Sequence, residues 1–194
     1  MINIRELRRY RLKIFTLYWT LTFYLKGKVL WKIKIGKNCI FNGKTILYRK
    51  EESEIKIGNN CRFVSEADNL NLIGINRPCI IATHAANASI EIGNSNGFSG
   101  TVIGAFKHIK IGNNIKCGAN TLITDSDWHL EDYRSGEPKE VIIGDNVWLG
   151  VNSIVLKGVT IGDNAVIGAN SVVTKNIPTN AIAAGNPCKV LRIL

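Results

Sequence analysis

The residues best suited to chemistry lie in one short segment, Thr-Asp-Ser-Asp-Trp-His at 124–129. A histidine side chain, with an ordinary pKa of about 6.5, accepts and returns a proton at neutral pH and therefore suits general acid–base work. Asp125 and Asp127 alternate with His129 and would share its face in an extended segment. One aspartate could orient the imidazole while the other binds hydroxyl groups, or one could be a solvated turn residue. Trp128 is expected either to stack on a ligand or a neighbouring subunit, or to pack in the core.

The element that must position this segment is a repeat. The phrase Ile-Gly-x-Asn, or a close variant, recurs at 35–38, 57–60, 73–76, 92–95, 111–114, 143–146 and 161–164. From Ile143 to Pro178 the repeat resolves into uninterrupted hexads, each opening with an aliphatic residue. One aliphatic residue in six suits short strands joined by tight corners, because Gly and Asn tolerate left-handed backbone angles. Three hexads make one triangular coil, and stacked coils pair as parallel strands. The sequence therefore predicts an all-β solenoid.

Departures from the repeat spacing predict insertions. Ile35 and Ile57 are 22 residues apart rather than eighteen, so about four extra residues at 49–52 should bulge outward. Ile111 and Ile143 are 32 residues apart, and the excess is a polar stretch at 130–142 that begins beside His129. Long loops leaving a regular scaffold are often functional.

These spacings divide the chain into an N-terminal helical segment and a solenoid. We expect the helical segment at 1–30 and the solenoid domain at 31–194, with its loop at 130–142 and its tail at 179–194.

The five cysteines form no Cys-x-x-Cys pair, and no cleavable signal peptide precedes them. Cys39, Cys61 and Cys79 each follow a repeat isoleucine by four residues, which predicts one stacked column of small interior residues rather than metal ligands. Cys117 and Cys188 add no ligand pattern, so we predict no metal site. Unpaired cysteines favour a reduced, cytoplasmic setting.

Basic residues are concentrated at the N-terminus. Residues 1–50 hold thirteen Lys or Arg and one acid, Glu6, whereas the other 144 residues hold twelve basic and fourteen acidic side chains. This distribution argues against a basic cleft for nucleic acid and predicts no nucleic-acid partner. Residues 4–26 read as a basic, aromatic-rich helix that either lies peripherally at the inner face of an anionic membrane or caps the solenoid. Its apolar part, 14–25, is too short to span a bilayer.

The last 80 or so residues resemble the hexapeptide-repeat acyltransferases and, within them, the maltose and galactoside O-acetyltransferase-like branch. The resemblance rests on TDSDWH (124–129), a loop with Arg134, IGDNVWLG (143–150), GVTIGDNAVIGANSVVTKNIP (158–178) and AGNPCKV (184–190). It implies a left-handed parallel β-helix, a homotrimer with sites between subunits, and acetyl-CoA as cosubstrate without a metal. It also implies that His129 is the general base for direct attack of a sugar hydroxyl on the thioester.

The same resemblance implies contacts to both substrates. Six residues are implied to contact acetyl-CoA: Val151 and Ala169 through their backbone at the pantetheine arm, Thr174 and Lys175 at its polar portion, and Lys189 and Arg192 at the nucleotide phosphates. Lys189 stands where some relatives have Arg. The segment GFSG (97–100) replaces an Asn-rich acceptor segment, so Ser99 is a candidate acceptor contact and simple galactosides or maltose are doubtful acceptors. Relatives of this form often modify capsule, O-antigen or exopolysaccharide sugars.

Three other functions compete with this interpretation. An N-acetyltransferase acting on an amino sugar or nucleotide sugar would share the CoA site and differ only at the acceptor. A γ-class carbonic anhydrase needs three zinc-binding histidines, but His84, His108 and His129 are spaced by 24 and 21 residues, which fits such a set poorly. A non-catalytic scaffold would more readily have lost His129 and the basic C-terminal pair.

Overall fold

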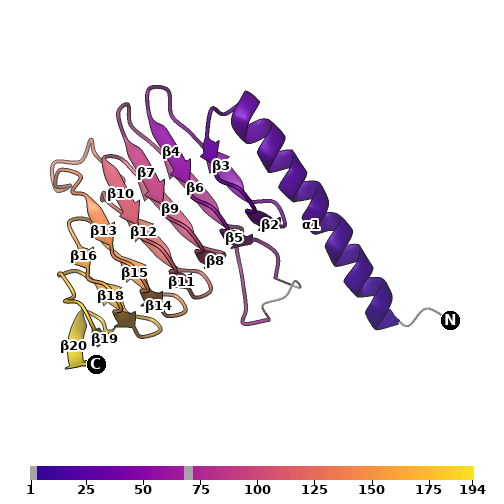
Figure 1. The fold of residues 1–194 in the computed structure, drawn as a ribbon. Coiled ribbons are helices and arrows are strands. Elements are labelled where there is room, and N and C mark those ends of the chain that lie inside the picture. Colours follow the sequence, from indigo (N-terminus) through magenta and orange to yellow (C-terminus); the bar gives the residue numbers. More distant parts are fainter. Residues whose placement is uncertain (1–3, 68–71) are drawn as a thin grey trace.

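The computed structural model describes residues 4–67 and 72–194, so the first three residues of the predicted segment 1–30 lie outside the described residues. A single helix, α1 (Ile4–Val29), precedes a stack of short strands (Figure 1). The strands recur in the same order coil after coil and build three sheets along the stack. The predicted solenoid is therefore confirmed.

The three sheets are the three faces of the coils. The first sheet contains β1 (Lys34–Ile35), β4 (Glu54–Ile57), β7 (Ser89–Ile92), β10 (His108–Ile111), β13 (Val141–Ile143) and β16 (Thr160–Ile161). The second sheet contains β2 (Ile40–Asn42), β5 (Arg62–Val64), β8 (Gly97–Ser99), β11 (Lys116–Cys117), β14 (Trp148–Leu149), β17 (Val166–Ile167), β19 (Ala181–Gly185) and β20 (Cys188–Ile193). The third sheet contains β3 (Ile46–Tyr48), β6 (Ile80–Thr83), β9 (Val102–Ala105), β12 (Leu122–Thr124), β15 (Ile154–Val155) and β18 (Val172–Val173). Neighbouring strands are parallel except β19 and β20, which close the C-terminal end as an antiparallel pair.

The repeated phrase explains the corner between the first and second sheets. Its isoleucine is buried in the coil, as at Ile111. Its glycine lies against the next coil: a Cβ on Gly58 would meet the carbonyl oxygen of Gly93 at 2.5 Å. Its last residue takes the left-handed conformation, with φ of 58° at Asn60 and at Asn114. Only small or amide side chains satisfy these constraints without strain, which is why this corner repeats Gly and Asn.

The outward faces of the first and third sheets differ in polarity. The first sheet carries charged residues outward over its first four strands, including Lys34, Lys56 and Glu91. The third sheet carries an unbroken register of aliphatic residues on its outer face: Ile46, Ile80, Val102, Leu122, Ile154 and Val172. The third sheet is therefore the face whose outer surface is apolar along the whole stack.

One part of the register predicted from sequence is wrong. Ile57 pairs with Ile92 and not with Ile75. The phrase at 73–76 lies in the connection between β5 and β6, where Ile75 packs on Val64 and Ala119. The repeat-like letters arise because this excursion also needs a glycine with positive φ, Gly74 at 87°.

The predicted column of three cysteines is therefore also wrong. Cys39 and Cys61 stack at one corner, since Ile40 donates its N–H to the carbonyl of Cys61. Cys79 lies at the next corner, between Thr45 and Thr101 in the stack. All three side chains are buried.

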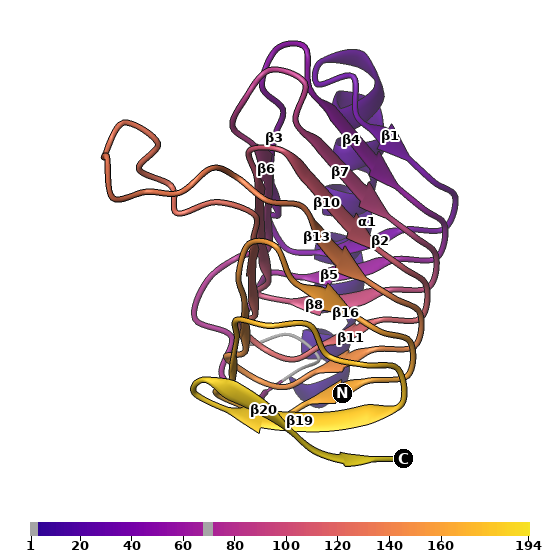
Figure 2. The ribbon, with the colours of Figure 1, turned by 90° about the vertical axis from the view of Figure 1, so that its left-hand side faces the viewer.

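The two predicted insertions are found where the spacing placed them. The segment between β3 and β4 holds the four extra residues near 49–52. The long excursion leaves the stack after β12 and returns at β13, projecting away from the coils (Figure 2). Because β13 begins at Val141, the last residues of the predicted loop 130–142 belong to a strand.

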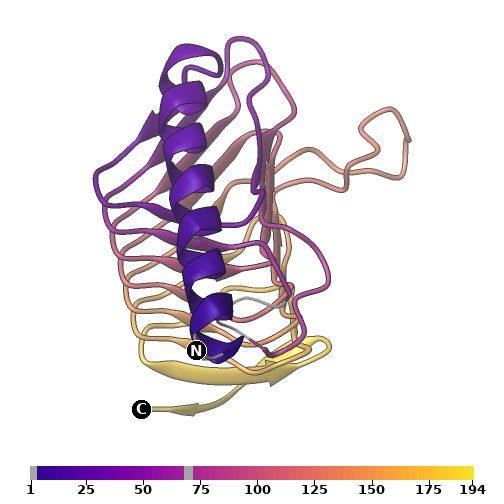
Figure 3. The ribbon, with the colours of Figure 1, turned by 90° about the vertical axis from the view of Figure 1, so that its right-hand side faces the viewer.

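Helix α1 lies across the open N-terminal end of the solenoid (Figure 3). Inside the coils the rings of Phe41, Phe63 and Phe98 stack, and Phe23 of the helix extends that stack with its ring centroid 4.6 Å from that of Phe41. The helix also satisfies the edge of the first coil, because Thr20 Oγ1 accepts the N–H of Phe41 at 3.0 Å. The capping alternative is thus observed: α1 covers apolar surface and pairs backbone groups that an end coil would leave open.

No helix within residues 4–67 and 72–194 has the length and apolar character that crossing a membrane would require.

Candidate active site

The segment 124–129 lies where β12 ends, at the corner between the third and first sheets. Asp125 is fully buried there. Its carboxylate accepts the backbone N–H groups of Phe106 at 2.7 Å and Lys107 at 2.8 Å, and its carbonyl accepts the N–H of Lys139 at 2.9 Å. Asp125 therefore ties the start of the loop both to the preceding coil and to the end of the loop.

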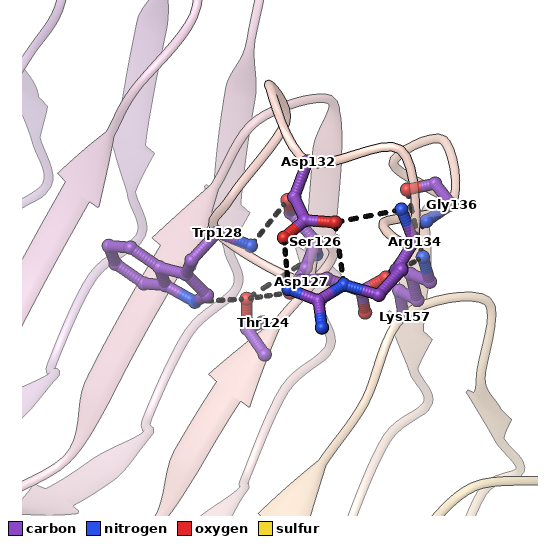
Figure 4. A network of polar contacts seen from close by, with 8 residues as sticks. All are labelled: Thr124, Ser126, Asp127, Trp128, Asp132, Arg134, Gly136 and Lys157. Atoms are coloured by element: carbon purple, nitrogen blue, oxygen red, sulfur yellow. Dashed lines mark hydrogen bonds and ion pairs between the residues drawn. The ribbon is translucent and has the colours of Figure 1, made fainter.

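Asp127 forms a second anchor for the loop (Figure 4). Its Oδ2 lies 2.5 Å from Lys157 Nζ and accepts the N–H of Gly136 at 3.1 Å. Lys157 also donates to the carbonyl of Gly136 at 2.9 Å. The lysine lowers the pKa of Asp127 below its ordinary value, with a further contribution from the Gly136 N–H.

Trp128 is the third anchor. Its Nε1–H donates to Thr124 Oγ1 at 2.9 Å, and its backbone adopts a φ of 71°. The indole centroid lies 4.6 Å from the ring of His84 and 5.4 Å from that of Phe106. Most contacts of Trp128 are therefore those of a side chain packed within the chain, as one of the two expectations held, although 41% of the residue remains exposed.

These anchors leave His129 itself in solvent. Its side chain is 78% exposed, and Nδ1 lies 3.5 Å from Glu131 Oε1. Both aspartates use their carboxylates on other groups of the same chain, so the expected orientation of His129 by Asp125 or Asp127 is not seen in the described structure. Within one chain, the backbone before His129 is held in place, and the described residues form no second side of a binding site opposite its imidazole.

Farther along the loop, Asp132 and Arg134 form a bidentate pair, with Arg134 Nε 2.9 Å from Asp132 Oδ1 and Nη2 2.5 Å from Oδ2. This pairing lowers the pKa of Asp132 to about 2. The pair shapes the loop from within, because the two residues are only two positions apart.

Ser99 lies elsewhere. It is on β8 in the second sheet and is nearly buried beside a groove of about 280 Å³ that Arg62 and Lys116 also line. The loop leaves from the corner on the opposite side of the third sheet. A single chain therefore does not bring Ser99 and His129 together through any contact that we observe among the described residues.

The residues implied to contact CoA fall into three groups on the C-terminal coils. Val151 and Ala169 stack at the corner between the second and third sheets, where Val151 already accepts the N–H of Asn170 at 2.8 Å through its carbonyl. Thr174 and Lys175 follow β18 at the other edge of the third sheet and are exposed. Lys189 and Arg192 are exposed on β20, paired with Ala184 and Ile182 of β19.

The two other histidines have structural contacts. His108 Nδ1 lies 2.7 Å from Ser89 Oγ on the first sheet. His84 sits in the aromatic cluster with Phe106 and Trp128, and burial lowers its pKa against a smaller opposing effect of Asp125. Within residues 4–67 and 72–194, no three His, Cys, Asp or Glu side chains are grouped closely enough to hold a metal ion.

Sequence reasoning missed two positions that shape the site. Lys157 holds Asp127, and Gly104 makes room for Trp128. A signal for Lys157 was present, because it lies eighteen residues before Lys175 and thus at the same corner of the preceding coil as that candidate. Gly104 carries no signal in the sequence, since its role depends on a ring that folds back from another coil.

Comparison with known proteins shows sequence similarity in the C-terminal coils. Residues 140–175 match the family described as the hexapeptide repeat of succinyl-transferase. Galactoside O-acetyltransferase of Escherichia coli is 34% identical over 119 residues, which cover 59% of this chain and 58% of that protein. Polysialic acid O-acetyltransferase of Neisseria meningitidis is 30% identical over 143 residues, covering 65% and 66%. The chain spans about half the length of the curated relatives it matches.

Solved structures extend the likeness to most of the chain. A variant of AntD, an N-acyltransferase from Bacillus cereus in complex with a nucleotide-linked amino sugar and coenzyme A, superposes with a TM-score of 0.63 at 19% identity, covering 86% of this chain and 87% of AntD. At that identity the likeness concerns the fold, the left-handed parallel β-helix. In its C-terminal coils the chain is similar in sequence to hexapeptide-repeat acetyltransferases, and over most of its length it has the same fold as AntD.

Proposed function

We propose that this chain transfers an acetyl group from acetyl-CoA to a sugar hydroxyl of a surface polysaccharide or its precursor. The observation that carries the proposal is the presentation of His129, whose imidazole stays open to solvent. Asp125, Asp127 and Trp128 fix the backbone before it, and the contacts of the two aspartates with Lys139 and Gly136 fix the returning part of the loop. The named activities of the galactoside and polysialic acid relatives support O-acetylation of a sugar. The five free cysteines support a reducing, cytoplasmic setting for the reaction.

In the proposed reaction the imidazole of His129 takes the proton of the acceptor hydroxyl as the oxygen attacks the thioester carbonyl. A carbon–oxygen bond forms and the carbon–sulfur bond breaks. The imidazolium then returns its proton to the leaving thiolate, which gives the acetyl ester and free CoA. The exposed cations Lys189 and Arg192 suit the nucleotide phosphates, because charge-assisted hydrogen bonds to phosphate are among the stronger ones.

The site at His129 lacks a second side within one chain, which supports a homotrimer. The outer face of the third sheet is aliphatic from Ile46 to Val172, whereas the first sheet is largely charged. An unbroken apolar face of this kind favours contact with another copy of the chain. The loop that carries His129 leaves from the edge of this face and would then lie beside a neighbouring subunit.

The trimer is tested by sedimentation of variants. Val102→Glu and Leu122→Glu place charges on the third sheet and should shift the protein to monomer. Lys110→Glu on the first sheet is the matched control and should leave the assembly unchanged. A wild-type protein that sediments as a monomer at all concentrations would contradict the proposed assembly.

The reaction is tested by CoA-thiol release with acetyl-CoA and a panel of polysaccharide repeat units, amino sugars and nucleotide sugars. His129→Ala should lower turnover by about 10²- to 10⁴-fold, the usual contribution of a general base. Acetyl-CoA binding and the oligomeric state should stay unchanged. Mass spectrometry and ester lability in mild alkali distinguish O-acetyl from N-acetyl products, and an alkali-stable amide would favour N-acetylation instead. Turnover that survives in His129→Ala would remove His129 as the base.

A further inference from the structure

Helix α1 has two apolar faces, and the cap uses only one of them. The inner face carries Trp19, Phe23 and Gly27, which pack on the first coil. The outer face carries large apolar residues that are each more than half exposed: Leu7, Tyr10, Ile14, Leu17, Tyr18, Leu21 and Leu25. At 100° per residue these side chains form one stripe directly opposite Phe23. We define this set as the outer stripe.

The outer stripe is long and points away from the molecule. Helix α1 has 26 residues and is therefore about 39 Å long. It lies across the end of the solenoid, so its outer side faces along the stack and away from the coils (Figures 1 and 3). Contiguous exposed apolar surface of this extent is uncommon on a protein without a binding partner for it.

Basic side chains flank the outer stripe on both sides. Arg8 and Arg11 project on one flank, and Arg9 and Lys13 project on the other, all of them exposed. Residues 4–29 hold seven Lys or Arg by sequence and one acid, Glu6. The flank with Arg9 and Lys13 also borders a groove of about 490 Å³ whose lining includes Arg62 of β5, which extends the positive charge onto the second sheet.

We propose that the outer stripe of α1 docks the protein onto an anionic membrane surface. An apolar stripe between basic flanks matches the two layers that such a surface offers, acyl chains at depth and anionic head groups above them. A helix lying in the interface uses both layers without crossing the bilayer.

The same charges argue against a second copy of the chain as the occupant. Two outer stripes packed together would bring together the basic flanks of both helices, with Glu6 as the single acid of each helix and Glu66 lining a groove beside Arg8 and Arg11. Like charges in contact oppose such pairing. An anionic lipid surface instead offers negative charge to Arg9, Arg11 and Lys13.

Docking gains strength if the protein is the proposed trimer. With the threefold axis along the stack, the three N-terminal ends face one side, and three outer stripes can engage the same surface at once. The docking itself does not depend on the trimer or on acetyl transfer, so failure of either leaves this proposal to be judged separately.

The test is flotation of the full chain with vesicles of phosphatidylcholine, with and without phosphatidylglycerol. Wild type should float with the anionic vesicles at about 0.1 M salt, and binding should weaken at about 0.5 M salt because the charges are then screened. Ile14 and Leu21 both face solvent, and Gln is a good helix former. The double variant Ile14→Gln with Leu21→Gln should therefore lower the partition coefficient at least tenfold. Far-UV circular dichroism and Tm should match wild type.

A charge variant separates electrostatic from apolar binding. Arg11→Gln with Lys13→Gln should lower the partition coefficient about 30-fold, since each basic residue near an anionic surface contributes about 1 kcal/mol. Lys110→Gln with Lys116→Gln removes the same charge from the sheets and should bind like wild type. Equal flotation of wild type and the Ile14/Leu21 variant, or equal flotation with and without phosphatidylglycerol, would overturn the proposal. Lipid-free self-association that the Ile14/Leu21 variant abolishes would instead assign the stripe to a second copy.

Discussion

The indole of Trp128 lies on Gly104 so closely that a Cβ at position 104 would meet the ring atom Cζ2 at 2.6 Å. The two residues come from successive coils of the third sheet, Gly104 on β9 and Trp128 just beyond β12. The missing side chain is therefore what allows the ring to fold back over the sheet. Since Trp128 precedes His129, the glycine helps to set the position of the candidate base.

Gly104→Ala is expected to displace the indole and, with it, His129. A misplacement of about 1 Å can cost about 10²-fold in rate, so we expect turnover to fall at least tenfold while acetyl-CoA binding persists. The indole N–H resonance of Trp128, which reports its bond to Thr124, should shift in ¹⁵N-labelled protein. Gly97→Ala is the matched control for that resonance, because a Cβ there would have its nearest neighbour at 4.0 Å. An unmoved Trp128 resonance in Gly104→Ala would contradict this account.

The contact between Asp127 and Lys157 predicts local rather than global effects. Asp127→Asn and Lys157→Met should raise hydrogen exchange in loop peptides around Gly136 several-fold, with little change in Tm, because exposed ion pairs contribute about 1 kcal/mol or less. Glu137→Gln removes an exposed charge from the same loop and should change neither quantity. Unaltered exchange in both clamp variants would mean that Asp125 and Trp128 suffice to hold the loop.

The same contact has a defined pH range. Because the pKa of Asp127 is lowered in the folded protein, its anchoring effect is complete above its ordinary value of about 3.9 and is lost as the pH falls through the lowered value. Loop protection corrected for intrinsic exchange should therefore be constant from about pH 5 to about pH 8. A loss of protection near neutral pH would assign the anchor to another titrating group.

The burial of His84 predicts that the folding stability decreases as the pH falls. A histidine paired with a carboxylate would have the opposite effect, with stability lost as the pH rises. Burial lowers its pKa, and Nε2 is buried without a hydrogen-bond partner among the described residues. The unfolded chain therefore takes up the proton first, so stability is unaffected above about pH 6.5 and falls as the pH drops toward the lowered pKa. His84→Phe, which keeps an aromatic ring beside Phe106 and Trp128, should flatten the decline of Tm between about pH 7 and about pH 5. Parallel curves for the two proteins would contradict the assignment.

The C-terminal cations predict selective loss of CoA affinity. If Lys189 and Arg192 meet the nucleotide phosphates, each change to Gln should raise the Kd for CoA about tenfold, in line with the strength of charge-assisted hydrogen bonds. The Kd for pantetheine, which has no nucleotide, should stay the same. Lys110→Gln serves as the control for a general change in surface charge. Calorimetric titration that shows equal losses for both ligands would place these residues elsewhere in the site.

The cysteines should be unreactive in the folded protein. All five are free and buried, and burial raises the pKa of the thiols of Cys79, Cys117 and Cys188. The neighbouring Cys61 thiol lowers the pKa of Cys39 to about 7, so the protection of Cys39 rests on its burial alone, with 1% of the residue exposed. A thiol that stays protonated is a poor nucleophile. Titration with an aromatic disulfide reagent should release almost no colour under native conditions and five equivalents after denaturation. Rapid native reaction at any site would indicate local opening of that coil.

Most of the solenoid was predictable from the sequence because its contacts repeat at a fixed separation. In the C-terminal coils residue i pairs with residue i + 18, as Ile143 does with Ile161, so a local pattern of aliphatic, Gly and Asn residues specifies the strands, corners and register together. The same regularity showed where four residues are inserted near 49–52 and where the long loop leaves the stack. The segment that carries His129 could be found for the same reason, since it stands at the break in that regularity.

The tertiary structure alone decided which residues the insertions bring together. Lys157 reaches Asp127 across 30 positions, and Phe106 lies 19 positions before Asp125. The first contact does not follow the period, because the loop brings Asp127 into reach of Lys157. The second joins successive coils at the local spacing of Ile92 and Ile111, but the pairing of a buried carboxylate with backbone N–H groups is not specified by the repeat. The false repeat at 73–76 and the misplaced Cys79 have the same cause: an excursion can reuse Ile, Gly and Asn for its own turns. For helix α1, the sequence indicated a basic, aromatic helix, and only packing on the first coil decided which apolar face is covered and which remains exposed.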